Sequence, residues 1–159
     1  MSLQKITPFL WFDYQAEEAA AFYTSIFPNS KVVRIARFGE VGPGPAGSAM
    51  TVEFQLEGQT FVALNGGPVF KFNEAVSFVV NCQTPEEVDF YWEKLSEGGA
   101  EVQCGWLKDK FGLSWQIVPT LLFKLLADSD RTRANRVMKE MLTMTKLDSR
   151  RLQQAYDNP

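Results

Sequence analysis

A missing residue type limits the chemistry of this chain more than any residue present in it. No histidine occurs among the 159 residues, so a Ser–His–Asp triad, a Cys–His pair and a histidine-ligated zinc site are all excluded. The two cysteines, Cys82 and Cys104, stand in apolar surroundings without a Cys-x-x-Cys pair. We expect them to be reduced and buried rather than to bind a metal. Acid–base chemistry would therefore have to rest on a carboxylate of raised pKa.

One such carboxylate lies on a predicted strand. Apolar and polar side chains alternate over residues 48–56, which predicts a half-buried strand. The apolar set is Met50, Val52, Phe54 and Leu56, and the polar set is Thr51, Glu53 and Gln55. This polar set indicates either a cavity that holds water or a ligand, or a face open to solvent, and both alternatives stay open. Glu53 is the candidate general base, with Thr51 and Gln55 as candidate binding residues.

A glycine-rich segment, residues 42–47, formally matches the GxGxxG pattern of nucleotide-binding loops. Such a loop must follow a parallel strand and open a helix, where free backbone N–H groups meet the ligand. Pro43 and Pro45 remove two of those donors, and the segment is expected to join two strands. We interpret it as an ordinary loop rather than as a site for a dinucleotide or for S-adenosylmethionine.

The elements that would position these residues form a pattern that occurs twice. The first half predicts strands over residues 6–12, 31–38, 48–56 and 59–65, with a helix over 17–27. The second half predicts strands over residues 75–82, 101–106 and 113–119, with a shorter one ending near 111, and a helix between Thr84 and Gly98. Both halves therefore read β-α-β-β-β. Phe22-Tyr23 and Phe90-Tyr91 recur at the same helix positions, 68 residues apart, which favours a duplication.

The last forty residues differ from this pattern. They predict helices over residues 121–127, 131–143 and 149–156, with Asp130 as one N-cap and Asp148 or Ser149 as another. Residues 1–119 carry 8 basic and 14 acidic side chains, whereas residues 120–159 carry 8 and 5. The acidic main part argues against nucleic acid as a partner, and the basic tail is expected to be solvated or docked within the protein.

The overall composition is that of a globular protein, with 45% hydrophobic and 22% charged residues, and the length fits one domain. Met1–Lys5 lack the apolar run of a signal peptide, and no stretch is apolar enough to cross a membrane. We expect a cytoplasmic protein without a membrane partner.

Three segments of this sequence resemble the PhnB-like branch of the vicinal-oxygen-chelate superfamily, often labelled the 3-demethylubiquinone-9 3-methyltransferase domain family. They are residues 6–30, with Ala19, Phe22-Tyr23 and Ile26–Ser30; residues 109–119, with Phe111-Gly112-Leu113-Ser114-Trp115-Gln116; and residues 136–152. The superfamily includes glyoxalase I, extradiol dioxygenases and bleomycin-resistance proteins. The resemblance implies an α+β fold of two βαβββ modules, residues 6–66 and 75–119. These would form a single domain, 1–119, followed by a C-terminal helical extension, 120–159.

The resemblance also implies where a metal would be bound in relatives that use one. The corresponding positions are Pro8, Asn65, Ala75 or Val76, and Gln116. Only the two amides could coordinate, and two neutral amides do not hold a divalent ion firmly. We therefore expect no metal and no cofactor, and we take Asn65 and Gln116 as candidate substrate-binding residues.

The resulting hypothesis is a protein that binds a small organic molecule in a metal-free cavity. An alternative is an enzyme on the same cavity, either a methyltransferase by family label only or a catalyst of metal-independent acid–base chemistry using Glu53. A second alternative is a protein-interaction module whose helical tail binds a partner. We also expect a homodimer, because edge strands need cover and superfamily members commonly pair their modules between chains.

Overall fold

The structure is a computed structural model that describes residues 4–159. Its contacts divide the chain into two compact units, Met1–Phe72 and Asn73–Pro159. The first three residues of the N-terminal segment, in which no signal peptide is expected, lie outside the described residues. Within residues 4–159, no helix has the length and apolar composition needed to cross a membrane.

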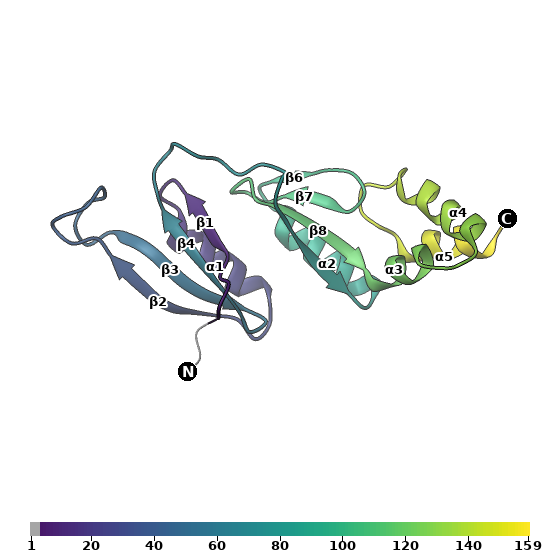
Figure 1. The fold of residues 1–159 in the computed structure, drawn as a ribbon, viewed down its shortest axis with the longest axis horizontal. Helices are drawn as coiled ribbons and strands as arrows, with labels where there is room; N and C mark the ends of the chain where they lie inside the picture. Colours follow the sequence, from purple (N-terminus) through teal and green to yellow (C-terminus); the bar gives the residue numbers. More distant parts are fainter. Residues whose placement is uncertain (1–3) are drawn as a thin grey trace. The chain divides into compact units, whose positions relative to one another are not determined.

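The first unit is a four-stranded sheet with one helix (Figure 1). In chain order its elements are β1 (Phe9–Phe12), α1 (Ala16–Ile26), β2 (Lys31–Arg37), β3 (Ala49–Leu56) and β4 (Gln59–Asn65). The sheet order is β1-β4-β3-β2; β1 is parallel to β4, and the other pairs are antiparallel. Helix α1 packs against β2, β3 and β4 and covers one face of the sheet.

The second unit repeats this topology. Its module consists of β5 (Ser77–Cys82), α2 (Pro85–Ser96), β6 (Ala100–Glu101), β7 (Trp106–Lys108) and β8 (Ser114–Pro119). The sheet order is β5-β8-β7-β6, with β5 parallel to β8. The predicted α+β fold of two βαβββ modules is therefore confirmed. The grouping of both modules into one domain of residues 1–119 stays a prediction.

The two helices bury equivalent residues against their sheets. Ala19, Tyr23 and Ile26 of α1 correspond to Val88, Trp92 and Leu95 of α2, and all six are at most 6% exposed. The members of each pair are separated in the sequence by one residue more than Tyr23 and Tyr91, the pair from which the repeat was predicted. The structure thus places Trp92, rather than Tyr91, at the central core position, because only that side chain faces the sheet.

Three sequence-based expectations need correction. Strand β1 begins at Phe9, and Ile6 is 82% exposed. Met50 is exposed and not buried with its neighbours, because it is the extra residue of a bulge in β3 opposite Ala36 and Arg37 of β2, so that Ala49 takes the buried position. The strand predicted over residues 101–106 is mostly a turn, since Cys104 and Gly105 adopt positive φ angles of 59° and 83°.

The helical extension packs on the end of the second module (Figure 1). It contains α3 (Thr120–Leu126), α4 (Arg131–Met141) and α5 (Ser149–Asp157). Asp130 and Asp148 cap α4 and α5 as predicted, each accepting hydrogen bonds from two backbone N–H groups. A core cluster joins the three helices to β8 through Val118, Leu122, Leu125, Val137, Met144, Leu147 and Leu152.

The extension is also hydrogen-bonded to the turn after β6, and several of its charged side chains are paired within the extension itself. The N–H groups of Cys104 and Gly105 donate to the carbonyl oxygens of Met144 and Thr145, both at 2.8 Å. The Arg136 guanidinium donates to backbone carbonyls near the end of α5, and Arg151 pairs with Glu140. These contacts agree with the interpretation of the basic tail as docked within the protein.

Candidate ligand-binding faces

The face of the first sheet turned away from α1, the first helix-distal face, carries three of the predicted residues. Thr51, Glu53 and Gln55 are half-buried and alternate with the buried Val52, Phe54 and Leu56 of β3. Register extends this face across the sheet, because Thr51 pairs with Leu64 and Leu64 with Trp11. A polar centre beside an aromatic β1 is a surface suited to a small organic molecule.

Glu53 has one charged partner on this face. Its Oε2 lies 3.1 Å from Nη2 of Arg34 on β2, and the two side chains are 25% and 76% exposed. The carboxylate is thus the more enclosed member of the pair, held between the exposed Arg34 and Val62 of β4. A carboxylate in this setting can accept a hydrogen bond or a proton from a molecule bound on the face.

Asn65 lies on the opposite side of the same sheet. Its Oδ1 accepts a hydrogen bond from the backbone N–H of Ala16 at 2.8 Å, and its Nδ2 donates to the carbonyl of Ala49 at 3.0 Å. The structure therefore does not bring Asn65 together with Glu53. Its amide joins the beginning of α1 to β3, and its role in binding a substrate stays a prediction.

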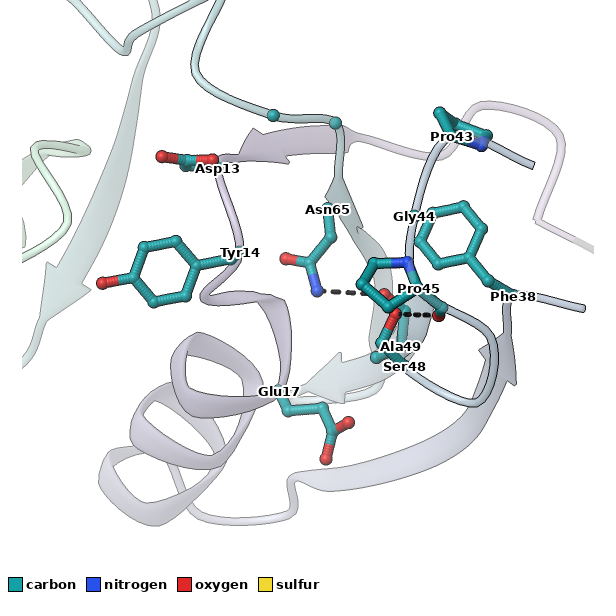
Figure 2. A pocket seen from close by; sticks show the side chains of 12 residues that line it. Asp13, Tyr14, Glu17, Phe38, Pro43, Gly44, Pro45, Ser48, Ala49 and Asn65 are labelled. Atoms are coloured by element: carbon teal, nitrogen blue, oxygen red, sulfur yellow. Dashed lines mark hydrogen bonds between the residues drawn. The ribbon is translucent and has the colours of Figure 1, made fainter. Parts of the chain in front are cut away.

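Asn65 also lines a pocket of about 460 Å³ within the first unit (Figure 2). The other walls come from the β1–α1 junction, the loop between β2 and β3, and the residues that follow β4. Thr51, Glu53 and Gln55 are not among the lining residues. The pocket is therefore separate from the first helix-distal face.

Gln116 lies on the corresponding face of the second sheet, the second helix-distal face. On β8 it lies between Val79 of β5 and Trp106 of β7. Its Nε2 donates a hydrogen bond to Oγ of Ser77 at 2.9 Å. The amide oxygen of Gln116 and the indole of Trp106 are the groups that this row offers to a bound molecule.

A further residue on this face, Ser114, was not among the sequence-based candidates. It is 1% exposed and pairs in register with Ser77 and Lys108. Its Oγ is the buried side-chain oxygen or nitrogen that has no hydrogen-bond partner within residues 4–159. Its spacing of two from Gln116 on one strand was the sequence signal that could have identified it.

Lys108 of β7, which lies on the same face, forms an ion pair with Glu74. The hydrogen bond from Lys108 holds the pKa of the Glu74 carboxyl below its ordinary value. Because the ammonium group is already paired and the Ser114 hydroxyl is buried, the half-buried amide of Gln116 is the stronger candidate for direct contact with a ligand.

Asp109 and Trp115 have structural roles. The Asp109 carboxylate accepts hydrogen bonds from the backbone N–H groups of Phe111 and Leu113 and from Nε1 of Trp115, at 2.9 to 3.1 Å. Both residues are buried. Lys108 is the last residue of β7, and the turn that leads to β8 follows it, so an interpretation of residues 108–110 as a turn is wrong for Lys108. Trp115 is a packing residue.

The residues at the positions used for metal binding in the superfamily do not fit a metal ion. Pro8, Ala75 and Val76 have no donor side chains, and both ends of the Asn65 amide are engaged in hydrogen bonds. Gln116 alone leaves an oxygen available. Across residues 4–159, no three Cys, Asp or Glu side chains are grouped so that they could hold a metal ion.

The glycine segment does not fit a methyl donor either. Residues 42–47 join β2 to β3, which are antiparallel, and no helix follows the segment. The free N–H groups at a helix N-terminus on which nucleotide loops depend are therefore missing. The segment therefore does not fit S-adenosylmethionine.

Comparisons with known proteins agree with this fold. The PhnB protein of Bacillus cereus, provisionally described as a 3-demethylubiquinone-9 3-methyltransferase, is 41% identical over 73% of this chain and 99% of its own, with a TM-score of 0.67. A Pseudomonas aeruginosa protein is 22% identical over 74% of this chain and 98% of its own (TM-score 0.60). The fosfomycin resistance protein FosX of Listeria monocytogenes is 16% identical over 75% and 93% (TM-score 0.55), a likeness that shows the fold alone.

No curated protein matches the chain. The family model described as 3-demethylubiquinone-9 3-methyltransferase matches residues 4–118, which include both modules and end before α3. The chain therefore belongs to this family, the PhnB-like branch of the vicinal-oxygen-chelate superfamily.

Proposed function

We propose that this protein binds a small organic molecule through the polar side chains of a helix-distal face, without a metal ion. The observation that supports the proposal is the half-buried amide of Gln116, whose nitrogen is held by Ser77 while its oxygen is left for a ligand. Two residues away, the buried hydroxyl of Ser114 has no hydrogen-bond partner among residues 4–159. A buried hydroxyl without a partner costs about 1–3 kcal/mol. A hydroxyl or amine group of a ligand can donate a hydrogen bond to the accessible amide oxygen of Gln116 instead.

The surroundings of these groups favour an aromatic or apolar ligand with a few oxygen atoms. Trp106 and Val79 flank Gln116 in register on the second face. On the first face, Phe9 is 58% exposed and aligns with Val62, next to Glu53. Such apolar surface beside a few polar groups is typical of small-molecule sites.

Native mass spectrometry of the protein as purified tests this proposal. We expect a bound organic molecule on the wild-type chain, and its loss from Gln116→Ala and Ser114→Ala. Gln59→Ala, at the exposed start of β4, is the matched control and should keep the ligand. A wild-type protein without any bound organic molecule, or variants that both retain it while folded, would contradict the proposal.

A second candidate function is metal-independent acid–base catalysis by Glu53. The observation that favours it is the enclosed position of the carboxylate, which is 25% exposed on a middle strand and fixed by Arg34. Glu53→Gln should then trap the unreacted substrate, so native mass spectrometry would find a bound mass different from that on the wild type. Glu93→Gln, on the exposed side of α2, is the control. Identical bound masses in all three proteins would contradict catalysis by Glu53.

We further propose that the chain forms a homodimer. Strand β2 is an edge of its own sheet and exposes Val32 and Val33 by 41% and 45%. Exposed apolar edge strands favour pairing with another chain. Light scattering at tens of micromolar should give about twice the 18.0 kDa chain mass; an 18.0 kDa particle would contradict the dimer.

A further inference from the structure

The pocket in the first unit is a candidate for a second kind of ligand. Figure 2 shows its walls: Asp13, Tyr14 and Glu17 on one side, the β2–β3 loop on the other, and Asn65 between them. The full lining is Asp13, Tyr14, Glu17, Phe38, Pro43, Gly44, Pro45, Ser48, Ala49, Asn65, Gly66 and Gly67. A volume of about 460 Å³ is in the range that holds a small organic ligand.

The charge of this lining is negative. Asp13 and Glu17 are its charged members, and it contains no lysine or arginine. Arg37 lies outside the lining, and its Nη1 pairs with Oε1 of Glu17 at 3.1 Å. The carboxylate of Asp13 has no hydrogen bond or ion pair with any residue in the described part of the chain. The Glu17 carboxylate is thus paired with Arg37, and the Asp13 carboxylate has no partner in the described part of the chain.

The opposite wall is apolar and held by hydrogen bonds at the base of its loop. Gly47 N donates to the carbonyl of Phe38, and Phe38 N donates to that of Ser48, at 2.8 and 2.9 Å. Phe38 packs so closely on Gly44 that a Cβ there would lie 2.3 Å from its ring. Pro43 and Pro45 complete a wall without charges.

The N-terminus of α1 does not provide an anion-binding site in this pocket. The backbone N–H of Ala16, its first residue, already donates to Oδ1 of Asn65. The first turn also carries Glu17 and Glu18, which oppose the binding of another negative charge. Both features disfavour the binding of an anionic ligand in the pocket.

We propose that this pocket binds a small organic monocation, an ammonium group attached to an apolar or aromatic body. The ammonium pairs with the Asp13 carboxylate, and its body lies against Phe38 and the two prolines. The exposed ring of Tyr14 offers a second, weaker attraction for the cation. This site is independent of Ser114 and Gln116, which belong to the other unit.

Titration of ¹⁵N-labelled full-length protein with benzylammonium, benzyl alcohol and benzoate, followed by NMR, tests this inference. The three probes share a ring and differ in charge. We expect benzylammonium to shift the amide signals of Asp13, Tyr14, Gly44 and Gly66, with an affinity that falls as salt is added. Benzyl alcohol should bind more weakly, and benzoate should not bind. Equal shifts with all three probes would show adventitious apolar contact only and would overturn the proposal.

A matched pair of variants completes the test. Asp13→Asn should weaken benzylammonium binding about three- to five-fold, as expected for one partly exposed charge pair. Glu57→Gln, an acid to amide change in the turn between β3 and β4 and outside the pocket, should leave the affinity unchanged. Equal effects of the two variants would mean that general charge, rather than Asp13, attracts the probe. Failure of benzylammonium to bind leaves the ligand proposed for Ser114 and Gln116 unaffected.

Discussion

The side-chain oxygen of Asn65 accepts a hydrogen bond from the backbone N–H of Ala16, across 49 residues of sequence. Through this bond the last residue of β4 satisfies the first amide of α1, which has no side-chain N-cap of its own. Asn65 thus contributes to the fold of the first module as well as to the wall of the pocket.

Asn65→Ala should therefore lower the free energy of unfolding by about 1–3 kcal/mol, because the N–H of Ala16 and the carbonyl of Ala49 both lose a partner. Urea denaturation measures the change. Asn65→Asp, which keeps the acceptor for Ala16 but loses the donor to Ala49, should fall between the wild type and the alanine variant. An alanine variant as stable as the wild type would show that the residue has no structural role.

Asp109→Ala should lower the free energy of unfolding more than the removal of an exposed acidic side chain does. Three donors lose their acceptor inside a buried turn, and we expect a loss of about 3 kcal/mol or more. The control is Asp89→Ala: this acid pairs with Lys146 at the surface and is 62% exposed, so the loss should stay within about 1 kcal/mol. Equal losses in the two variants, measured by urea denaturation, would contradict the structural role of Asp109.

The purified protein should contain well below one metal ion per chain. The reason is the chemistry of Pro8, Asn65, Ala75, Val76 and Gln116, which together leave one neutral oxygen as a donor. Elemental analysis measures the content, and added Ni²⁺ should produce no glyoxalase activity. One Zn, Ni or Fe per chain, retained after mild chelation, would be the contrary result.

Cys82 should resist alkylation in the folded protein. Burial, with a smaller contribution from the charge of Glu87, raises the pKa of its thiol from 9.0 to about 12. The thiol therefore stays protonated and unreactive at pH 8. Iodoacetamide followed by peptide mass mapping should find Cys82 modified only after unfolding in urea. Full modification of the native protein at pH 8 would contradict this expectation.

The same shift predicts how stability changes at high pH. Above about pH 9 the unfolded chain releases the Cys82 proton that the folded chain retains. The unfolded state then binds fewer protons, so the contribution of this group to stability is present below pH 9 and is lost as pH rises toward 12. Cys82→Ala should show a shallower loss of stability over this range, measured by urea denaturation.

Much of the fold could be predicted because its signals are local. The cap residues Thr84, Asp130 and Asp148 lie within three residues of the N–H groups that they bind. Sequence spacing therefore identifies Thr84 and Asp130, and it narrows the third cap to Asp148 or Ser149. The alternation along β3 likewise predicted the buried positions of Val52, Phe54 and Leu56. It failed at Met50, because a bulge depends on how β2 pairs with β3, and one strand alone does not show it.

The sequence by itself determined the repeated modules, the helical extension and the lack of histidine chemistry. Only the tertiary structure decided which candidate residues lie together. Asn65 shares a hairpin with Glu53, yet it lies on the other side of the sheet, because strand parity and a bond to distant Ala16 place it there. Ser114 is polar like many exposed serines, and only packing makes its hydroxyl buried and leaves it without a hydrogen-bond partner among residues 4–159. Burial, pairing and pockets depend on residues far apart in sequence, and short-range spacing carries little of that information.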